Sequence, residues 1–473
     1  MKYVLSSLLI IALGLTACAQ MALRGGVGSA PEAKDMALVG FNDLQNRSAY
    51  QPVIHRQGDR FIAYIGHHGG TALNSLTGRV EANGTSVVDV TDPRNPQYLA
   101  HVPGSPAGSG EAGGAQMVRV CDGKDLPKGD RTKTYLLRTF GNEGHEILDV
   151  SDPSKPTLLT KVISGLTTTH KNWWECDTGI AYLVSYKKDE GWRSRGVKIY
   201  DLSDPSQPRY IRDFGLVGQE PGSKGEPVPQ ALHGPIRLGN RVYFGYGSSS
   251  AGTLQIVDRE KLLNGNPAAK DRFAPTPENL AYPVIAQQNT PEFMGAHTTL
   301  PQLDFTVPEF AKDANPQVRD FIVMVNEAGG NECQGATRQL MYILDITDEL
   351  NPFAVASYQV PEASGNFCSR GGRFGSHASN ENVDSPFNKK IVFVSWFNAG
   401  VRAIDIREPY SPKEVGYFIP TTNSNTFANG GKFVIQTNNV EVDDRGYIYI
   451  VDRAGSGMHV LRLTGAAAQI IAQ

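Results

Sequence analysis

The sequence predicts an all-β fold, a seven-bladed β-propeller with an N-terminal strand closing the last blade. Two observations support this prediction. An Asp-Pro phrase recurs along the chain, for example from Asp89 (Asp-Val-Thr-Asp-Pro) and from Asp149 (Asp-Val-Ser-Asp-Pro), and a recurring unit of this length indicates an array of similar modules. Short apolar runs rich in Val, Ile, Leu and Tyr surround each copy, and few stretches show helical periodicity.

The Asp-Pro phrase marks the turn between two strands of each module. Clear copies begin at Asp89, Asp149 and Asp201, and weaker or degenerate copies begin at Asp345, Asp405, Ile256 and Ile450. The Asp carboxylate can accept backbone N–H bonds, and Pro presets the φ angle of the bend. One strand precedes each turn and one follows it, and two more lie upstream. Four short strands per copy are typical of a propeller blade.

The last module is incomplete, because strands are expected near 439–442, 447–451 and 458–463 but no fourth strand follows. The run Met36-Ala-Leu-Val-Gly-Phe looks like an outer strand that has lost its own blade. We expect it to complete blade seven, since closing the ring removes exposed sheet edges. The propeller is therefore predicted to span residues 36–465, and residues 466–473 are a C-terminal tail.

The repeated Ile/Val-Leu/Val-Asp-Val/Ile-Ser/Thr-Asp-Pro pattern resembles the LVIVD-repeat family of bacterial β-propeller proteins. The resemblance covers about residues 36–465. It implies the propeller fold and names no particular activity.

The N-terminus has the features of a signal peptide, which we assign to residues 1–17. Lys2 precedes the apolar run 4–15, and Leu-Thr-Ala-Cys ends at Cys18. This ending resembles a bacterial lipoprotein box, which implies that Cys18 is lipidated and anchors the chain in a membrane; Ala19 then favours the outer membrane. The alternative is ordinary cleavage near Ala19 and a soluble periplasmic protein. Residues 18–35 are expected to be a flexible tether.

Charge and cysteine content limit the classes of binding partner and the cellular compartment of the protein. A formal net charge of −3 and the absence of a nucleic-acid-binding motif argue against DNA or RNA as partners. Four cysteines remain beyond Cys18, an even number that suits an oxidising compartment. We expect disulfides Cys121–Cys176 and Cys333–Cys368; the alternative is four buried free thiols.

Four of the ten histidines fall at the expected start of an inner strand in consecutive blades: His170, His233, His297 and His377. Inner strands of a propeller begin at one mouth of the central channel, so these side chains are predicted to gather there. Other residues expected at this mouth, as ligand-binding candidates, are Gln116, Glu143, His145, Glu327, Arg370, Arg373, Trp396 and Arg453. The pair His67 and His68 is expected on the loop surface.

The four histidines allow two interpretations. Neutral imidazole is a common metal ligand, and such a set suits Fe, Cu or Zn. The layout is similar to the iron site of carotenoid cleavage oxygenases, which are also seven-bladed propellers, although the Asp-Pro repeats are not that family's pattern. Alternatively, each histidine hydrogen-bonds the backbone of the next blade and serves the fold alone.

Three functional hypotheses follow. The first is a cell-envelope propeller that binds a small ligand or a protein partner at a histidine-rich mouth. The second is a metal-dependent enzyme, an oxidoreductase or a lyase, with His170, His233, His297 and His377 as ligands. The third is a structural envelope scaffold, for which we expect a mouth plugged by loops.

Overall fold

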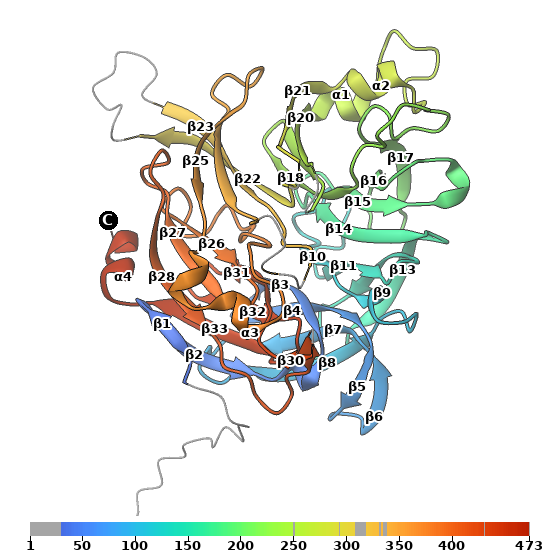
Figure 1. Cartoon of the computed structure of the whole chain (residues 1–473). Coiled ribbons are helices and arrows are strands. Elements are labelled where there is room, and N and C mark those ends of the chain that lie inside the picture. Colours follow the sequence, from blue (N-terminus) through green and yellow to red (C-terminus); the bar gives the residue numbers. More distant parts are fainter. Residues whose placement is uncertain are drawn as a thin grey trace, which may run out of the picture.

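The computed structural model describes residues 30–472, except 249–250, 293, 308–317, 331–332, 334–337 and 430. In this part of the chain, seven antiparallel sheets surround a central axis (Figure 1). The predicted seven-bladed β-propeller is therefore confirmed. In blades one to five, the chain runs from the inner strand outwards.

The first four blades follow one another along the chain. Blade one contains β3 (Ala49–Gln57), β4 (Arg60–Gly69), β7 (Gly84–Asp89) and β8 (Gln97–Pro103). Blade two contains β10 (Val118–Asp122), β11 (Thr134–Phe140), β12 (Gly144–Asp149) and β13 (Thr157–Ser164). Blade three contains β14 (Thr168–Trp174), β15 (Ile180–Tyr186), β16 (Gly196–Asp201) and β17 (Arg209–Phe214). Blade four contains β18 (Leu232–Leu238), β19 (Arg241–Tyr246), β20 (Thr253–Asp258) and β21 (Val284–Asn289).

The last three blades include the N-terminal strands. Blade five contains β22 (Thr298–Thr306), β23 (Val318–Val325), β24 (Met341–Asp345) and β25 (Phe353–Tyr358). Blade six contains β26 (Ile391–Ser395), β27 (Val401–Asp405), β28 (Lys413–Ile419) and β1 (Glu32–Lys34). Its inner position is held by an irregular segment that touches β26 through the bridge Ser379–Val394. Blade seven contains β31 (Thr437–Val442), β32 (Ile448–Asp452), β33 (Met458–Leu463) and β2 (Met36–Asn42).

The N-terminal strand β2 closes the ring, as the sequence predicted. It pairs antiparallel with β33, from Met36 opposite Leu463 to Asn42 opposite Met458. Gly40 lies close against the Asp-Pro turn of blade one, because a Cβ there would stand 2.0 Å from the carbonyl oxygen of Pro93. Strand β1 comes from the segment that was expected to be a tether, and it adds to the outer edge of blade six.

The Asp-Pro turns have the expected hydrogen bonds. In blade one, Asp89 Oδ1 accepts the N–H of Thr91 at 2.8 Å, and Asp92 Oδ1 accepts that of Arg94 at 3.0 Å. Blade two repeats this with Asp149 and Ser151 at 3.0 Å. These side chains fix the bend between the third and fourth strands.

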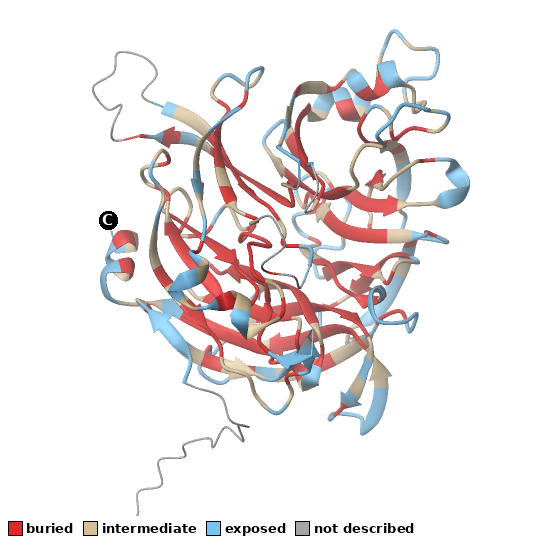
Figure 2. Cartoon of the chain, in the orientation of Figure 1, coloured by how far each residue is buried: buried red, intermediate tan, exposed pale blue. Residues whose placement is uncertain are grey.

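Apolar side chains fill the spaces between blades, and the buried strands form a ring around the axis (Figure 2). Both predicted disulfides are present. Cys121–Cys176 joins blades two and three within one buried cluster, and Cys333–Cys368 joins two loops of blades five and six. Two disulfides indicate an extracellular or periplasmic location.

Several elements lie outside the blades. The connections at one end of the propeller carry the hairpin β5–β6 (Thr71–Asn74 and Arg79–Ala82), β9 (Gly110–Ala115), α3 (Phe367–Arg370) and the hairpin β29–β30 (Ala428–Asn429 and Lys432–Phe433). Helices α1 (Arg259–Asn264) and α2 (Pro277–Ala281) lie between β20 and β21, and α4 (Gly465–Ala472) ends the described chain. Among the described residues, none of the helices has the length and apolar character needed to span a membrane.

Candidate metal centre at the channel mouth

The four histidines lie together at the mouth, the end of the propeller where inner strands begin and second strands end. His170 lies on β14 and His233 on β18, His297 directly precedes β22, and His377 lies on the irregular inner segment of blade six. All four are buried. Ring centroids of successive histidines are 4.6, 4.6 and 4.5 Å apart. The register inferred from the repeats therefore brings the four rings into contact.

Their nitrogen atoms converge closely enough for a shared ion. His170 Nε2 lies 2.9 Å from His233 Nδ1. One ring nitrogen each from His170, His233 and His297 lie within 4.8 Å of one another, and so do ligand atoms of His297, Glu327 and His377. Neighbouring ligands about 2.1 Å from one ion stand roughly 3–3.5 Å apart. Modest side-chain movements would thus let three or four of these groups coordinate one metal.

Two of the rings present a nitrogen that is free to coordinate. His377 Nδ1 donates to the carbonyl oxygen of Asn438 at 2.6 Å, so in the neutral ring Nε2 carries the lone pair. His297 Nε2 is buried without a hydrogen bond among the described residues, and its nearest carboxylate is Glu327 at 3.9 Å. A backbone carbonyl behind one ring nitrogen is a common way to orient a metal-binding histidine.

The charge state of the histidines also suits a metal. Burial lowers the pKa of all four, and nearby cationic groups such as Arg195, Lys171 and Arg453 lower the pKa of some of them further. Neutral imidazoles are therefore expected at neutral pH. Metal coordination requires this neutral form.

Two side chains near the histidines were not foreseen from the sequence. The Tyr50 hydroxyl lies 3.3 Å from His170 Nε2, and the Tyr50 ring packs edge-on against the rings of His68 and His377. Glu111 Oε2 lies 3.5 Å from His170 Nδ1. Glu111 is carried by β9, which pairs with β4 from a connection between blades and has no counterpart in the repeat.

A cavity of about 660 Å³ lies beside His233. His233 forms part of its wall, and charged side chains of both signs line it: Glu111, Arg193, Arg195, Glu327 and Arg373. Arg373 forms an ion pair with Glu327 at 3.1 Å. Burial raises the pKa of Glu327, and Arg373 offsets part of that rise. The metal candidate thus lies at the wall of a polar space that a small molecule could occupy.

The structure brings together half of the eight further candidates. Gln116 Nε2 lies 3.4 Å from His170 Nδ1, Glu327 and Arg373 line the cavity, and Arg453 Nη2 lies 3.5 Å from His68 Nε2. His68 itself is buried, as is His67, so the expectation that this pair lies on the loop surface is wrong. Both belong to the end of β4, which continues further towards the mouth than its apolar run indicated.

The other four candidates lie apart from the histidines. Glu143 accepts a hydrogen bond from Ser105 at 2.5 Å, and His145 is buried on β12 within blade two. Arg370 forms an ion pair with Glu32 at 2.6 Å. Trp396 packs into the core against Tyr358.

Deeper in the channel, a layer of buried charges follows the histidines. Lys171 Nζ lies 2.8 Å from Glu381 Oε1, and Arg119 forms a second ion pair with Glu381. The two cations outweigh burial and lower the pKa of Glu381 to about 2. Burial raises the pKa of neighbouring Glu441 to about 7. The aliphatic part of the Lys171 side chain packs against Gly234, where a Cβ would lie 2.8 Å from Lys171 Cδ.

Comparison with known proteins agrees with the fold. The family model described as LVIVD repeat matches residues 139–163, which include β12 and most of β13. The chain carries an LVIVD repeat. The match covers part of blade two, including its Asp-Pro turn, whereas the resemblance predicted from the sequence extends over residues 36–465. No curated protein matches the sequence.

Several solved structures resemble the chain at low sequence identity. Chaetomium thermophilum Raptor gives a TM-score of 0.51 at 10% identity; the match covers 93% of this chain, which spans only 30% of that one. A Bacteroides fragilis protein with the provisional name 6-phosphogluconolactonase gives 0.46 at 12% identity, covering 86% of this chain and 95% of that one. Chaetomium thermophilum Sqt1 gives 0.45 at 10% identity, covering 90% of each chain. These likenesses concern the fold alone.

Proposed function

We propose that this propeller binds one transition-metal ion through His170, His233, His297 and His377, and that the ion helps to hold a small ligand in the adjoining cavity. The observation that carries the proposal is the convergence of ring nitrogens from separate blades, with His170 Nε2 and His233 Nδ1 only 2.9 Å apart. A purely structural role for the histidines would not require all four rings to meet at one place.

The ligand set favours a metal of intermediate softness. Imidazoles suit Fe, Cu and Zn, and no thiolate is offered, since the four cysteines outside the N-terminal segment form disulfides. Glu327 stands 3.9 Å from His297 Nε2 and 3.7 Å from His377 Nε2. It could orient these rings or join them as an oxygen ligand.

The cavity beside the histidines supports ligand binding. A metal reached from an open space keeps a coordination position for an incoming molecule. The same arrangement favours a metal-dependent reaction, by an oxidoreductase or a lyase, as the second candidate function. The scaffold hypothesis expected a mouth plugged by loops, and a cavity of about 660 Å³ speaks against that arrangement.

Metal analysis of the protein purified from its native envelope tests the proposal. We expect about one transition-metal ion per chain, lost when His233→Ala and His297→Ala are combined. His459→Gln is the matched control, because His459 is also buried but contacts Phe41 and Phe418 in blades seven and six. A metal-free wild-type protein that also fails to take up Fe, Cu or Zn would refute the proposal, as would a double variant that keeps its metal.

Ligand access is tested separately with the Co²⁺-loaded protein. Azide should change the visible absorption spectrum of the bound ion if a coordination position opens onto the cavity. A spectrum that does not respond would mean that the protein binds a metal but does not present it to small ligands.

A further inference from the structure

We infer that the mouth face of the propeller docks onto an anionic lipid surface. The mouth face is the end that carries the metal candidate and the hairpins β5–β6 and β29–β30. Three observations on the described residues support the inference. They are exposed apolar side chains on both hairpins, the position of these hairpins next to each other, and the place where the N-terminal segment leaves the propeller.

The hairpin β5–β6 is an insertion between the second and third strands of blade one (Figure 1). It exposes Leu73, Leu76 and Val80 to more than half of their full surface. Leu73 and Val80 face each other across the hairpin register. The hairpin contributes little to the propeller core, so the sheet itself does not require these apolar side chains.

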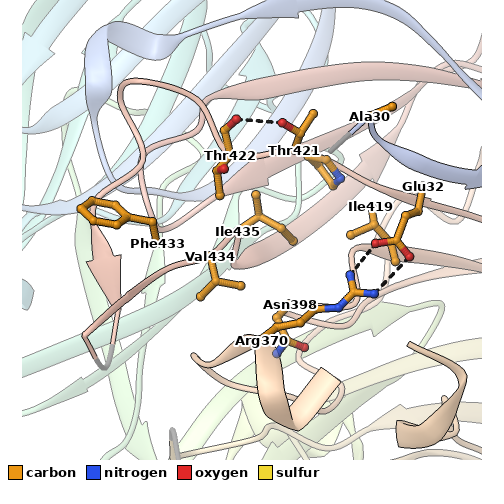
Figure 3. Close-up of a pocket in the computed structure, with 11 residues that line it drawn as sticks. Ala30, Glu32, Arg370, Asn398, Ile419, Thr421, Thr422, Phe433, Val434 and Ile435 are labelled. Atoms are coloured by element: carbon orange, nitrogen blue, oxygen red, sulfur yellow. Dashed lines mark hydrogen bonds and ion pairs between the residues drawn. The ribbon is translucent and has the colours of Figure 1, made fainter. Parts of the chain in front are cut away.

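Two exposed aromatic rings lie at the hairpin β29–β30: Phe427 directly precedes β29, and Phe433 is on β30. Phe433 also lines a second cavity, of about 420 Å³, with Val434, Ile435 and Ile419. Figure 3 shows these side chains along the cavity, with Ile419 next to the ion pair of Arg370 and Glu32 and Phe433 on the opposite side. Ile419, Val434 and Ile435 are buried, so the exposed apolar surface of this hairpin consists of Phe427 and Phe433.

The two hairpins flank one short turn, η1 (Leu44–Asn46), which follows β2. Gln45 Nε2 donates to Ser75 Oγ of the first hairpin at 2.9 Å. On the other side, Asn425 Nδ2 lies 3.5 Å from Asp43 Oδ2. The exposed side chains therefore belong to neighbouring parts of one face rather than to scattered loops, and such grouping indicates an interaction surface.

The N-terminal segment leaves from the same face. Glu32 pairs with Ile419 at the mouth end of β28, and Ala30 lines the second cavity. The preceding residues include Cys18, for which the sequence predicts a lipid anchor. The predicted tether therefore reaches the propeller at its mouth face.

The charges around the apolar side chains favour an anionic surface. Arg79 lies next to Val80, and Lys432 lies next to Phe433; both are exposed. The Lys432 ammonium donates to the carbonyl oxygen of Ser369. The acidic Glu81, on the other side of Val80, accepts hydrogen bonds from Asn74 and Thr77 within the hairpin. Long basic side chains beside inserted apolar groups can place their charged ends among lipid phosphates. We therefore commit to a bilayer containing phosphatidylglycerol as the partner of this face.

Vesicle co-sedimentation of the processed chain with Cys18→Ser tests the inference without a lipid anchor. The mouth variant combines Leu73→Ser, Val80→Ser and Phe433→Ser, and the control combines Leu158→Ser, Leu350→Ser and Phe353→Ser on outer strands and at the opposite end. All six side chains are more than half exposed, so folding should be retained, and thermal melting checks this. With vesicles of phosphatidylethanolamine and phosphatidylglycerol, we expect binding that falls about tenfold or more in the mouth variant alone.

A second measurement reports which face inserts. Phe433 and Leu350 are each 70% exposed. Phe433→Trp should be quenched by brominated lipids, and Leu350→Trp should not. Equal quenching of the two, absence of vesicle binding, or equal losses in the two triple variants would overturn the inference. Capture of a protein partner without vesicle binding would overturn it too.

Discussion

His170 and His233 come from neighbouring blades, and Nε2 of the first lies 2.9 Å from Nδ1 of the second. Two nitrogens at this separation either share one proton or point towards one ion. Adjacent ligands at about 2.1 Å from a metal stand about 3 Å apart when they subtend a right angle. Small rotations of the two rings would therefore convert the contact into a pair of metal ligands.

Metal binding should stabilise the fold, because the ligands come from four different blades. Adding Zn²⁺ or Co²⁺ at about 100 times the dissociation constant should raise the free energy of unfolding by about 2.7 kcal/mol, provided that the unfolded chain does not bind the ion. Thermal melting of the chelator-treated protein, with and without metal, measures this gain. The combined His233→Ala and His297→Ala variant should show no gain; an equal gain would place the ion elsewhere.

Replacing only one partner of the buried ion pair Lys171–Glu381 should lower the free energy of unfolding substantially. Glu381→Gln leaves the Lys171 ammonium buried without its carboxylate, and we expect a loss of about 3–5 kcal/mol in the free energy of unfolding. Combining it with Lys171→Met should cost less than the sum of the two single changes. Urea denaturation of the four proteins gives this coupling. Simple additivity would show that the ion pair does not act as a unit.

Stability should fall as pH rises through the titration of Glu441. Its pKa is raised from 4.5 to about 7, so the folded chain keeps a proton that the unfolded chain has already released. Between these pH values the free energy of unfolding should therefore decrease, by about 3 kcal/mol in total. Glu441→Gln should remove this decrease. Asp452 also has a raised pKa, but it is present in both proteins, so its contribution is the same in both pH profiles. Parallel pH profiles of wild type and variant would contradict the assignment.

Ring closure should depend on Gly40. A Cβ at this position would lie 2.0 Å from the Pro93 carbonyl oxygen, so Gly40→Val must displace β2 or the turn of blade one. We expect a loss of about 1–3 kcal/mol and faster hydrogen exchange in β2 and β33. Gly225→Val serves as the control, since the space around Gly225 is open and its backbone is outside the left-handed region. If amide hydrogen exchange in β2 and β33 is equally fast in the two variants, β2 does not hold the ring closed.

The repeat made much of the structure predictable. Because the Asp-Pro turns align the modules, they gave the strands of each blade, the closure by β2, both disulfides and the common position of the four histidines. Features without a repeat pattern were missed. Glu111 reaches His170 from the inserted strand β9, and Lys171 meets Glu381 across a separation of 210 residues.

Local backbone geometry explains another difference. The sequence placed Trp396 at the mouth, directly after β26. In the structure, the following Phe397 has a left-handed backbone with φ 39°, which ends the strand alternation. The Phe397 ring then lies 4.9 Å from His377, and Trp396 packs into the core. Sequence periodicity alone could not predict that the regular alternation of side chains ends at Trp396 and Phe397.

The central claim is a single metal ion shared by histidines of separate blades. A crystal of the metal-loaded protein, measured at the absorption edge of the metal, tests it most directly. We predict one anomalous peak within about 2.2 Å of ring nitrogens from at least three of His170, His233, His297 and His377. A peak at another place, or histidine rings that stay hydrogen-bonded to one another with no metal between them, would contradict the account.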